Sequence, residues 1–226
     1  MEADFWQTRW ANNQIGFHEG KTNSFLATYF DRLALAPGAR VFVPLCGKTR
    51  DISWLLARGF KVAGAELSPL AVEQLFAELG VTPTITAAGP LVRHSGPAID
   101  IFQGDIFQLT GQMLGPVDAI YDRAALVALP APMRSSYTRH LMDITGTAPQ
   151  LLITFTYDQS AVDGPPFSVT PEEIRTHYAA AYNVDQLAGV PLPGGLKGKY
   201  DATENTWLLR TPAAAHPDRS GPGRDA

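Results

Sequence analysis

The stretch VFVPLCGKT, residues 41–49, indicates the fold most clearly. Its first five residues are apolar and rich in valine and aromatic side chains, which is typical of a strand buried on both faces of a sheet. Gly47 follows in a tight turn, and residues 49–58 then carry apolar side chains at helical spacing and end at Gly59. We therefore predict a buried strand, a tight loop and a helix.

The same alternation continues along the chain. Residues 61–66 (KVAGAE) predict a second strand, and Ser68 with Pro69 provides an N-cap and a first-turn proline for a helix to about residue 79. Residues 87–97 contain Gly and Pro and are interpreted as an interruption. Further strands are predicted at 99–102, 117–121, 150–156 and 206–209, and helices at 131–145 and 171–181. This order predicts a doubly wound, mostly parallel α/β sheet with helices on both faces.

The two ends of the chain differ from this pattern. Residues 1–24 hold Phe5, Trp6, Trp10 and Phe17, which is too much aromatic surface to leave in water, so we expect this segment to pack on another part of the protein. Residues 211–226 are rich in Pro, Ala and Gly and predict a disordered tail. Residues 1–210 are expected to form a single domain.

Composition excludes several classes of protein. Lys and Arg number 18 against 22 Asp and Glu, giving a net charge of −4, so no basic excess favours nucleic acid. Cys46 is the lone cysteine, and the five histidines lack metal-ligand spacing, so neither a disulfide nor a metal site is expected. The N-terminus resembles neither a signal peptide nor a membrane anchor, and a cytoplasmic monomer is predicted.

Polar or glycine residues follow four of the predicted strands. In a doubly wound sheet, ligands bind outside the carboxyl ends of the strands. Any one of these features could be only a turn, a helix cap or a solvated acid, but four together indicate a ligand site. They are Gly47, Glu66, Gly104 with Asp105, and Asp122 with Arg123.

Glu66 points to an adenosine-containing ligand. It lies 19 residues after Gly47, at the position where nucleotide-binding sheets place an acid that accepts hydrogen bonds from the ribose hydroxyls. A phosphate-binding loop would need glycine where Phe42 stands, and a dinucleotide loop would need two more glycines. S-adenosylmethionine carries no phosphate and is therefore favoured, with a nucleotide-dependent oxidoreductase as the alternative.

Four blocks of sequence resemble the thiopurine S-methyltransferase family. The resemblance runs from about residue 5 to residue 210. It implies a class I methyltransferase (Rossmann-like) fold with a seven-stranded sheet, and an N-terminal segment that folds over S-adenosylmethionine. The blocks are WQTRWANNQIGFH (6–18), VPLCGKTRDISWLLARGFKVAGAELS (43–68), YDRAALVALP (121–130) and GPPFSV (164–169).

The resemblance also implies residue roles. The 164–169 block would form a wall of the substrate pocket, and Phe17 matches a position that touches the substrate. Six residues would bind the cofactor: Trp10 packs on it, Leu45 lines the first loop, Glu66 takes the ribose hydroxyls, Asp105 and Ile106 flank the adenine, and Arg123 borders the methionine end.

The expected reaction is methyl transfer to a small thiol or to a selenium or tellurium compound. An acidic aromatic thiol is already largely ionised near neutral pH, so no strong general base is required, and we assign no catalytic residue. Asp122 is the best candidate if a base is used, although a structural role suits it better. A non-catalytic protein that binds S-adenosylmethionine as a sensor is the alternative from another class.

Overall fold

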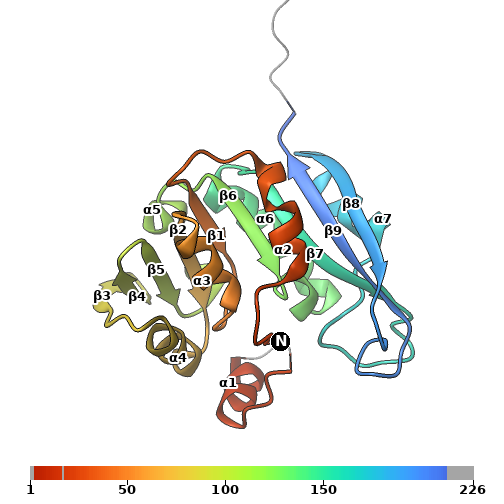
Figure 1. Cartoon of the computed structure of the whole chain (residues 1–226), viewed down its shortest axis with the longest axis horizontal. Helices are drawn as coiled ribbons and strands as arrows, with labels where there is room; N and C mark the ends of the chain where they lie inside the picture. Colours follow the sequence, from red (N-terminus) through yellow and green to blue (C-terminus); the bar gives the residue numbers. More distant parts are fainter. Residues whose placement is uncertain (1–2, 17, 213–226) are drawn as a thin grey trace, which may run out of the picture.

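The computed structural model describes residues 3–16 and 18–212 and is built around one nine-stranded sheet (Figure 1). The strand order is β3-β4-β5-β2-β1-β6-β7-β9-β8. In chain order the strands are β1 (Arg40–Val43), β2 (Lys61–Glu66), β3 (Thr84–Ala88), β4 (Leu91–Gly96), β5 (Ile99–Gln103), β6 (Ala119–Arg123), β7 (Gln150–Tyr157), β8 (Asn183–Pro191) and β9 (Ala202–Arg210).

Seven α-helices and three short 3-10 helices connect the strands within the described residues. The α-helices are α1 (Ala3–Ala11), α2 (Ser24–Tyr29), α3 (Arg50–Ala57), α4 (Pro69–Leu79), α5 (Gly111–Leu114), α6 (Ala131–Thr145) and α7 (Pro171–Tyr178). The 3-10 helices are η1 (Phe30–Leu33), η2 (Ile106–Gln108) and η3 (Leu126–Ala128).

The sheet confirms the predicted α/β class. Strands β5, β2, β1, β6 and β7 pair in parallel. The outer strands are antiparallel: β4 to β5 and β3 to β4 at one edge, and β9 to β7 and β8 to β9 at the other. The predicted number of strands, seven, is wrong by two. The order from β5 to β8 accounts for seven strands, and the β3–β4 hairpin extends the edge next to β5.

The hairpin corrects the interpretation of residues 87–97 as an interruption. Its strands have mostly exposed or half-buried side chains, so they lack the continuous apolar run that marks a buried strand. Gly89, with φ of 59°, lies in the turn between them. Strand β8 was also not predicted, because it is mostly exposed and its alternation is broken by an irregularity between Gln186 and Ala188.

Capping side chains mark the starts of α3 and α4, and of these caps Ser68 was predicted. The side chain of Thr49 accepts a hydrogen bond from Asp51 N at the start of α3, and Ser68 accepts one from Ala71 N at the start of α4. Helix α4 and helix α6 have the predicted bounds. Helix α7 begins after Thr170 as predicted but ends at Tyr178, three residues early.

Helices cover both faces of the sheet. On one face, α2, η1, α3 and α4 bury side chains against the sheet, for example Leu26, Ile52 and Leu75. On the other face, α5, α6 and α7 do the same, for example with Leu141 and Ile174. Helix α1 lies apart from both layers, below the carboxyl ends of the parallel strands, and the chain leaves β9 at the opposite end of the sheet (Figure 1).

Candidate functional site

Four predicted positions meet at the carboxyl edge of the parallel strands. Leu45, Glu66, Asp105 and Arg123 stand at or just after the ends of β1, β2, β5 and β6. These four strands are consecutive neighbours in the sheet, in the order β5-β2-β1-β6. The fold therefore gathers the predicted residues along one edge, where ligands bind in sheets of this type.

The loop after β1 has an unusual backbone. Leu45 has φ of 45° and Gly47 has φ of 51°, so two of three successive residues adopt the left-handed region. The N–H of Cys46 between them donates to Ala65 O at 3.0 Å, which ties the loop to the neighbouring strand β2. The Lys48 ammonium turns away to pair with Glu78 at 2.9 Å. The loop thus presents backbone rather than a cation.

Glu66 is buried and its two oxygens have separate backbone partners. Oε2 accepts from Gly47 N at 2.7 Å, and Oε1 accepts from Ser68 N at 2.8 Å. Burial raises the pKa of this carboxyl, and these hydrogen bonds oppose the rise. Leu67 N–H is a third backbone donor to this carboxyl. Because a carboxylate has about four lone-pair sites, acceptor capacity remains for a ligand hydroxyl.

Trp10 closes over the loop from the N-terminal side. Its side chain is only 5% exposed although α1 stands outside the main layers. A Cβ built on Gly47 would lie 3.0 Å from Trp10 Cζ2, so the indole packs directly on that glycine. Trp10 of the aromatic N-terminal segment therefore packs on the loop after β1.

Asp105 and Ile106 form the start of η2. Asp105 is exposed, and its side chain caps η2 by accepting from Phe107 N at 3.0 Å. Ile106 is buried, and its carbonyl oxygen lies 2.8 Å from His140 Nε2 on α6. Asp105 and Ile106 thus place one exposed polar side chain and one buried apolar side chain beside the end of β5.

Arg123 connects the end of β6 to the N-terminal segment. Its guanidinium lies 2.5 Å from Glu19, and its side chain is 11% exposed. Glu19 was not predicted, since no sequence pattern pairs it with a residue 104 positions away. Phe17, the predicted substrate residue, lies outside the described residues.

Asp122 is a structural acid in this arrangement. It is fully buried and accepts hydrogen bonds from Leu126 N at 3.1 Å and from the Tyr137 hydroxyl at 2.8 Å. Burial raises its pKa from 3.8 to about 6. Asp122 therefore holds the turn from β6 into η3 against α6.

The segment around Gly164–Phe167 packs beside β7. Phe167 N donates to Val127 O of η3 at 2.6 Å, and the Tyr157 hydroxyl donates to Pro166 O at 2.6 Å. The segment is therefore attached to η3, which follows β6, and to the end of β7.

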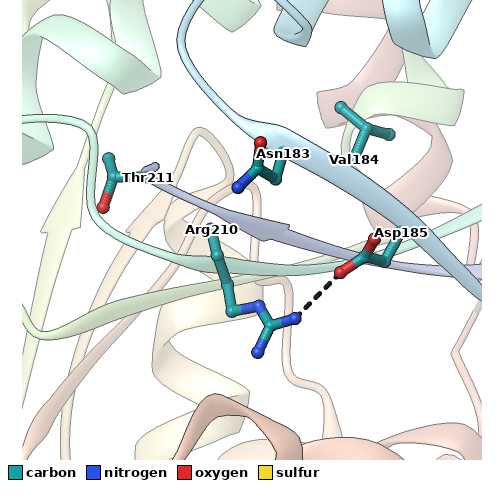
Figure 2. A pocket seen from close by; sticks show the side chains of 5 residues that line it. All are labelled: Asn183, Val184, Asp185, Arg210 and Thr211. Atoms are coloured by element: carbon teal, nitrogen blue, oxygen red, sulfur yellow. Dashed lines mark hydrogen bonds and ion pairs between the residues drawn. The ribbon is translucent and has the colours of Figure 1, made fainter. Parts of the chain in front are cut away.

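Two surface hollows lie away from these residues. One, of about 640 Å³, is lined by Asn183, Val184, Asp185, Arg210 and Thr211 (Figure 2). Leu209 pairs with Gln150, the first residue of β7, so this hollow lies at the amino end of the parallel strands. The other, of about 400 Å³, is lined by residues of α1 and by Gln14. Neither hollow is lined by a predicted site residue, so the candidate site is defined by the residues at the strand ends.

The described residues hold neither a helix that could span a membrane nor a cluster of potential metal ligands. No helix in the described ranges is long and apolar enough to cross a bilayer. Among the same residues, no group of three or more His, Cys, Asp or Glu side chains could hold a metal ion.

The residues at the carboxyl edge suit a phosphate-free adenosine cofactor. The loop cation, Lys48, is paired with Glu78, so the loop lacks the free lysine of a phosphate cradle. Glu66 keeps acceptor capacity for hydroxyls, and Ile106 and Trp10 offer apolar surface for a ring. S-adenosylmethionine fits this set of groups.

Solved structures with the same fold are methyltransferases. A methyltransferase dependent on S-adenosylmethionine, from Anabaena variabilis, matches with a TM-score of 0.61 at 15% identity, covering 93% of this chain and 95% of that one. Magnesium protoporphyrin IX methyltransferase from Synechocystis, solved with bound S-adenosylhomocysteine, matches with a TM-score of 0.60 at 14% identity, covering 93% and 100%. The fold is that of a class I S-adenosylmethionine-dependent methyltransferase.

Sequence comparison then identifies the family within this class of methyltransferases. The family model of thiopurine S-methyltransferase matches residues 1–193. The thiopurine S-methyltransferase of Xanthobacter autotrophicus is 64% identical over 210 residues, which is 92% of this chain and 99% of the relative. That of Gluconobacter oxydans is 48% identical, covering 91% and 93%. The chain belongs to the thiopurine S-methyltransferase family, and it is an enzyme that uses S-adenosylmethionine.

Proposed function

We propose that this enzyme methylates small thiols, with reduced selenium or tellurium compounds as chemically related acceptors. One observation carries the proposal: residues that follow β1, β2, β5 and β6 converge at a single sheet edge, and Trp10 packs on Gly47 in the first of these loops. The named relatives support a sulfur acceptor, because both are thiopurine S-methyltransferases. We also propose that the enzyme is a cytoplasmic monomer acting on small molecules rather than nucleic acid.

The cofactor half of the site would extend along β5, β2 and β1. We propose that Asp105 and Ile106 flank the adenine, that Glu66 accepts from the ribose hydroxyls, and that Leu45 lines the amino-acid part. Glu66 is suited to this because Gly47 N and Ser68 N already fix both of its oxygens. A carboxylate held in this way needs no reorganisation when a ligand arrives.

The N-terminal segment would complete the cofactor site. Trp10 rests on Gly47, next to Leu45, so its indole would cover the loop and keep water from the reacting centre. Arg123, at the end of β6, would border the methionine end, and Glu19 orients its guanidinium at 2.5 Å. The segment would therefore contribute Trp10 directly to the site and would orient Arg123 through Glu19.

S-adenosylmethionine, when bound, supplies a methyl group on a positively charged sulfur. The contribution of the protein is positioning, since the nucleophile, the methyl carbon and the leaving sulfur must lie in line. We assign no general base. Asp122 is committed to Leu126 N and the Tyr137 hydroxyl, which leaves it a structural part of the β6 turn.

The acceptor would bind towards β6 and β7. The sheet order leaves this side of the edge free of the proposed adenosine contacts. The 164–167 segment borders it, fixed by Phe167 N on Val127 O and by the Tyr157 hydroxyl on Pro166 O. Phe17 stays a prediction as a substrate contact, because it lies outside the described residues.

Two alternatives lose support. An oxidoreductase would need the additional glycines that the loop at Gly47 lacks. A non-catalytic sensor would share the cofactor residues, but family membership and the named relatives favour turnover.

A panel of acceptors tests the proposal. The purified protein is incubated with S-adenosylmethionine and, separately, thiophenol, 6-mercaptopurine, a selenol and catechol, and methylated products are measured by mass spectrometry. We expect methylated sulfur and selenium products and no methylated catechol. Methylation of catechol alone, or no product despite cofactor binding, would contradict a soft acceptor.

A further inference from the structure

Asp51 is a buried carboxylate that the proposed reaction does not use. It lies in the first turn of α3 and is only 1% exposed. Three donors surround it: Asn23 N at 2.8 Å to Oδ1, the Tyr121 hydroxyl at 2.9 Å to Oδ2, and the Thr49 hydroxyl at 3.0 Å to Oδ2. A buried carboxylate with three partners is held firmly in place.

The three donors belong to three separate parts of the fold. Thr49 closes the loop after β1, Tyr121 lies in β6 two residues before Arg123, and Asn23 precedes α2. Burial, followed by the charge of Asp51, raises the pKa of Tyr121, so its hydroxyl stays protonated and donates. Asp51 therefore joins the cofactor loop, the strand that carries Arg123 and the base of the N-terminal segment.

Asn23 is the point where the N-terminal segment leaves the folded body. Its side chain caps α2 by accepting from Phe25 N at 2.9 Å and Leu26 N at 3.2 Å, while its backbone N–H faces Asp51. Residues after Asn23 are anchored in α2. Residues before it include Glu19, paired with Arg123, and Trp10, packed on Gly47.

We propose that Asp51 is a positioning residue that fixes the base of the N-terminal segment, so that Trp10 and Glu19 reach the cofactor site. It acts through Asn23 and touches neither cofactor nor acceptor. The inference rests on the proposed role of this segment in cofactor binding. Linkage then makes the effect reciprocal: bound cofactor holds the segment closed, and a firmly held segment tightens cofactor binding.

Trypsin digestion and cofactor binding test the proposal on the full chain. Lys21 is exposed within the segment, and Arg139 on α6 is an exposed reference site in the folded body. We expect Asp51→Ala to speed cleavage after Lys21 by about tenfold, and to raise the Kd for S-adenosylhomocysteine by about tenfold, from loss of a charge-assisted hydrogen bond. Cleavage after Arg139, and kcat at saturating cofactor, should change less than about threefold.

Two further variants guard against simple misfolding. Asp51→Asn keeps one acceptor oxygen for Asn23 N and should fall between the wild type and Asp51→Ala in both measurements. Tyr121→Phe removes only the contact on the strand side and should have the smaller effect. The matched control is Asp31→Asn, an exposed acid on η1 paired with Arg58, the residue after α3, which should alter neither measurement.

The outcomes separate positioning from stability and from the proposed function. Equal acceleration at Lys21 and Arg139 would show general destabilisation and overturn the proposal. Faster cleavage after Lys21 with unchanged Kd would also overturn it, because the segment would then be unrelated to cofactor binding. Failure of the wild type to bind S-adenosylhomocysteine would overturn the proposed function itself, a result that cleavage alone cannot produce.

Discussion

The carboxylate of Glu66 accepts a hydrogen bond from the backbone N–H of Gly47 at 2.7 Å, across the gap between β2 and the loop after β1. These two residues stand 19 positions apart in sequence: Glu66 ends β2, and Gly47 lies in the loop after β1, the parallel neighbour of β2. The bond orients the acid and fixes the loop at the same time. Both elements proposed to hold the cofactor therefore depend on one contact.

Glu66→Ala should weaken cofactor binding strongly. It removes the proposed acceptor of the ribose hydroxyls and leaves Gly47 N and Ser68 N without their partner, so we expect the Kd for S-adenosylhomocysteine to rise about a hundredfold. Isothermal titration calorimetry measures this change. Glu172→Gln, at an exposed position of α7, is the control and should bind as the wild type does. A change below threefold for Glu66→Ala would refute the ribose role.

Gly47→Ala should displace Trp10. The added Cβ would lie 3.0 Å from Trp10 Cζ2, and the φ of +51° costs a further ~1 kcal/mol. Loss of the aromatic contact should raise the Kd for S-adenosylhomocysteine by roughly threefold to tenfold. Gly38→Ala is a matched control, because Gly38 has φ of +76° with nothing within 4 Å of its Cβ position. It should lower the melting temperature without changing Kd; equal Kd changes in both variants would contradict a specific contact.

Asp122 should make stability depend on pH. Its pKa is about 6 in the folded protein and 3.8 as the ordinary value, so between these values the folded chain binds a proton that the unfolded chain has released. The free energy of unfolding therefore falls as pH rises from about 4 to about 6, on the order of 3 kcal/mol for this group, and is then constant.

Asp122→Asn should abolish that slope, because the amide does not titrate. Denaturant unfolding of both proteins from pH 4 to pH 7 isolates the effect, since the raised pKa of Glu66 contributes equally to each curve. Parallel curves would show that the pKa of Asp122 is not raised. We also expect kcat to fall less than about tenfold in Asp122→Asn, in keeping with a structural acid rather than a base.

Arg134→Ala should affect the acceptor side. Arg134 is 3% exposed, donates to Ser168 O at 3.1 Å, and pairs with both oxygens of Glu173 at 2.8 Å. Its guanidinium also lies 5.6 Å from the centre of the Phe167 ring. Removing it should destabilise the fold by about 3 kcal/mol and raise the acceptor KM several-fold, while the cofactor Kd stays unchanged.

An exposed ion pair at the amino end of the parallel strands serves as the control for Arg134. Arg210 pairs with Asp185 at 2.9 Å, with side chains 51% and 48% exposed (Figure 2). Arg210→Ala should cost less than about 1 kcal/mol and leave KM unchanged. If the folded Arg134→Ala variant has an unchanged acceptor KM, the 164–167 segment takes no part in substrate binding.

The sequence predicted the central part of the fold well. Buried parallel strands need continuous apolar runs, and helix starts need caps such as Ser68, so both leave strong local patterns. Polar strands at the sheet edges do not, since they are exposed on at least one face. The β3–β4 hairpin and β8 were missed for this reason.

The sequence by itself determined the α/β class, the cofactor type, the family and the position of Glu66, because each depends on local composition or on a fixed spacing along the chain. Only the tertiary structure decided which distant groups meet. It paired Glu19 with Arg123, placed Trp10 on Gly47, and brought donors from Asn23 and Tyr121 to Asp51. These contacts join residues far apart in sequence, and their distances depend on strand order and helix packing, which no local pattern encodes.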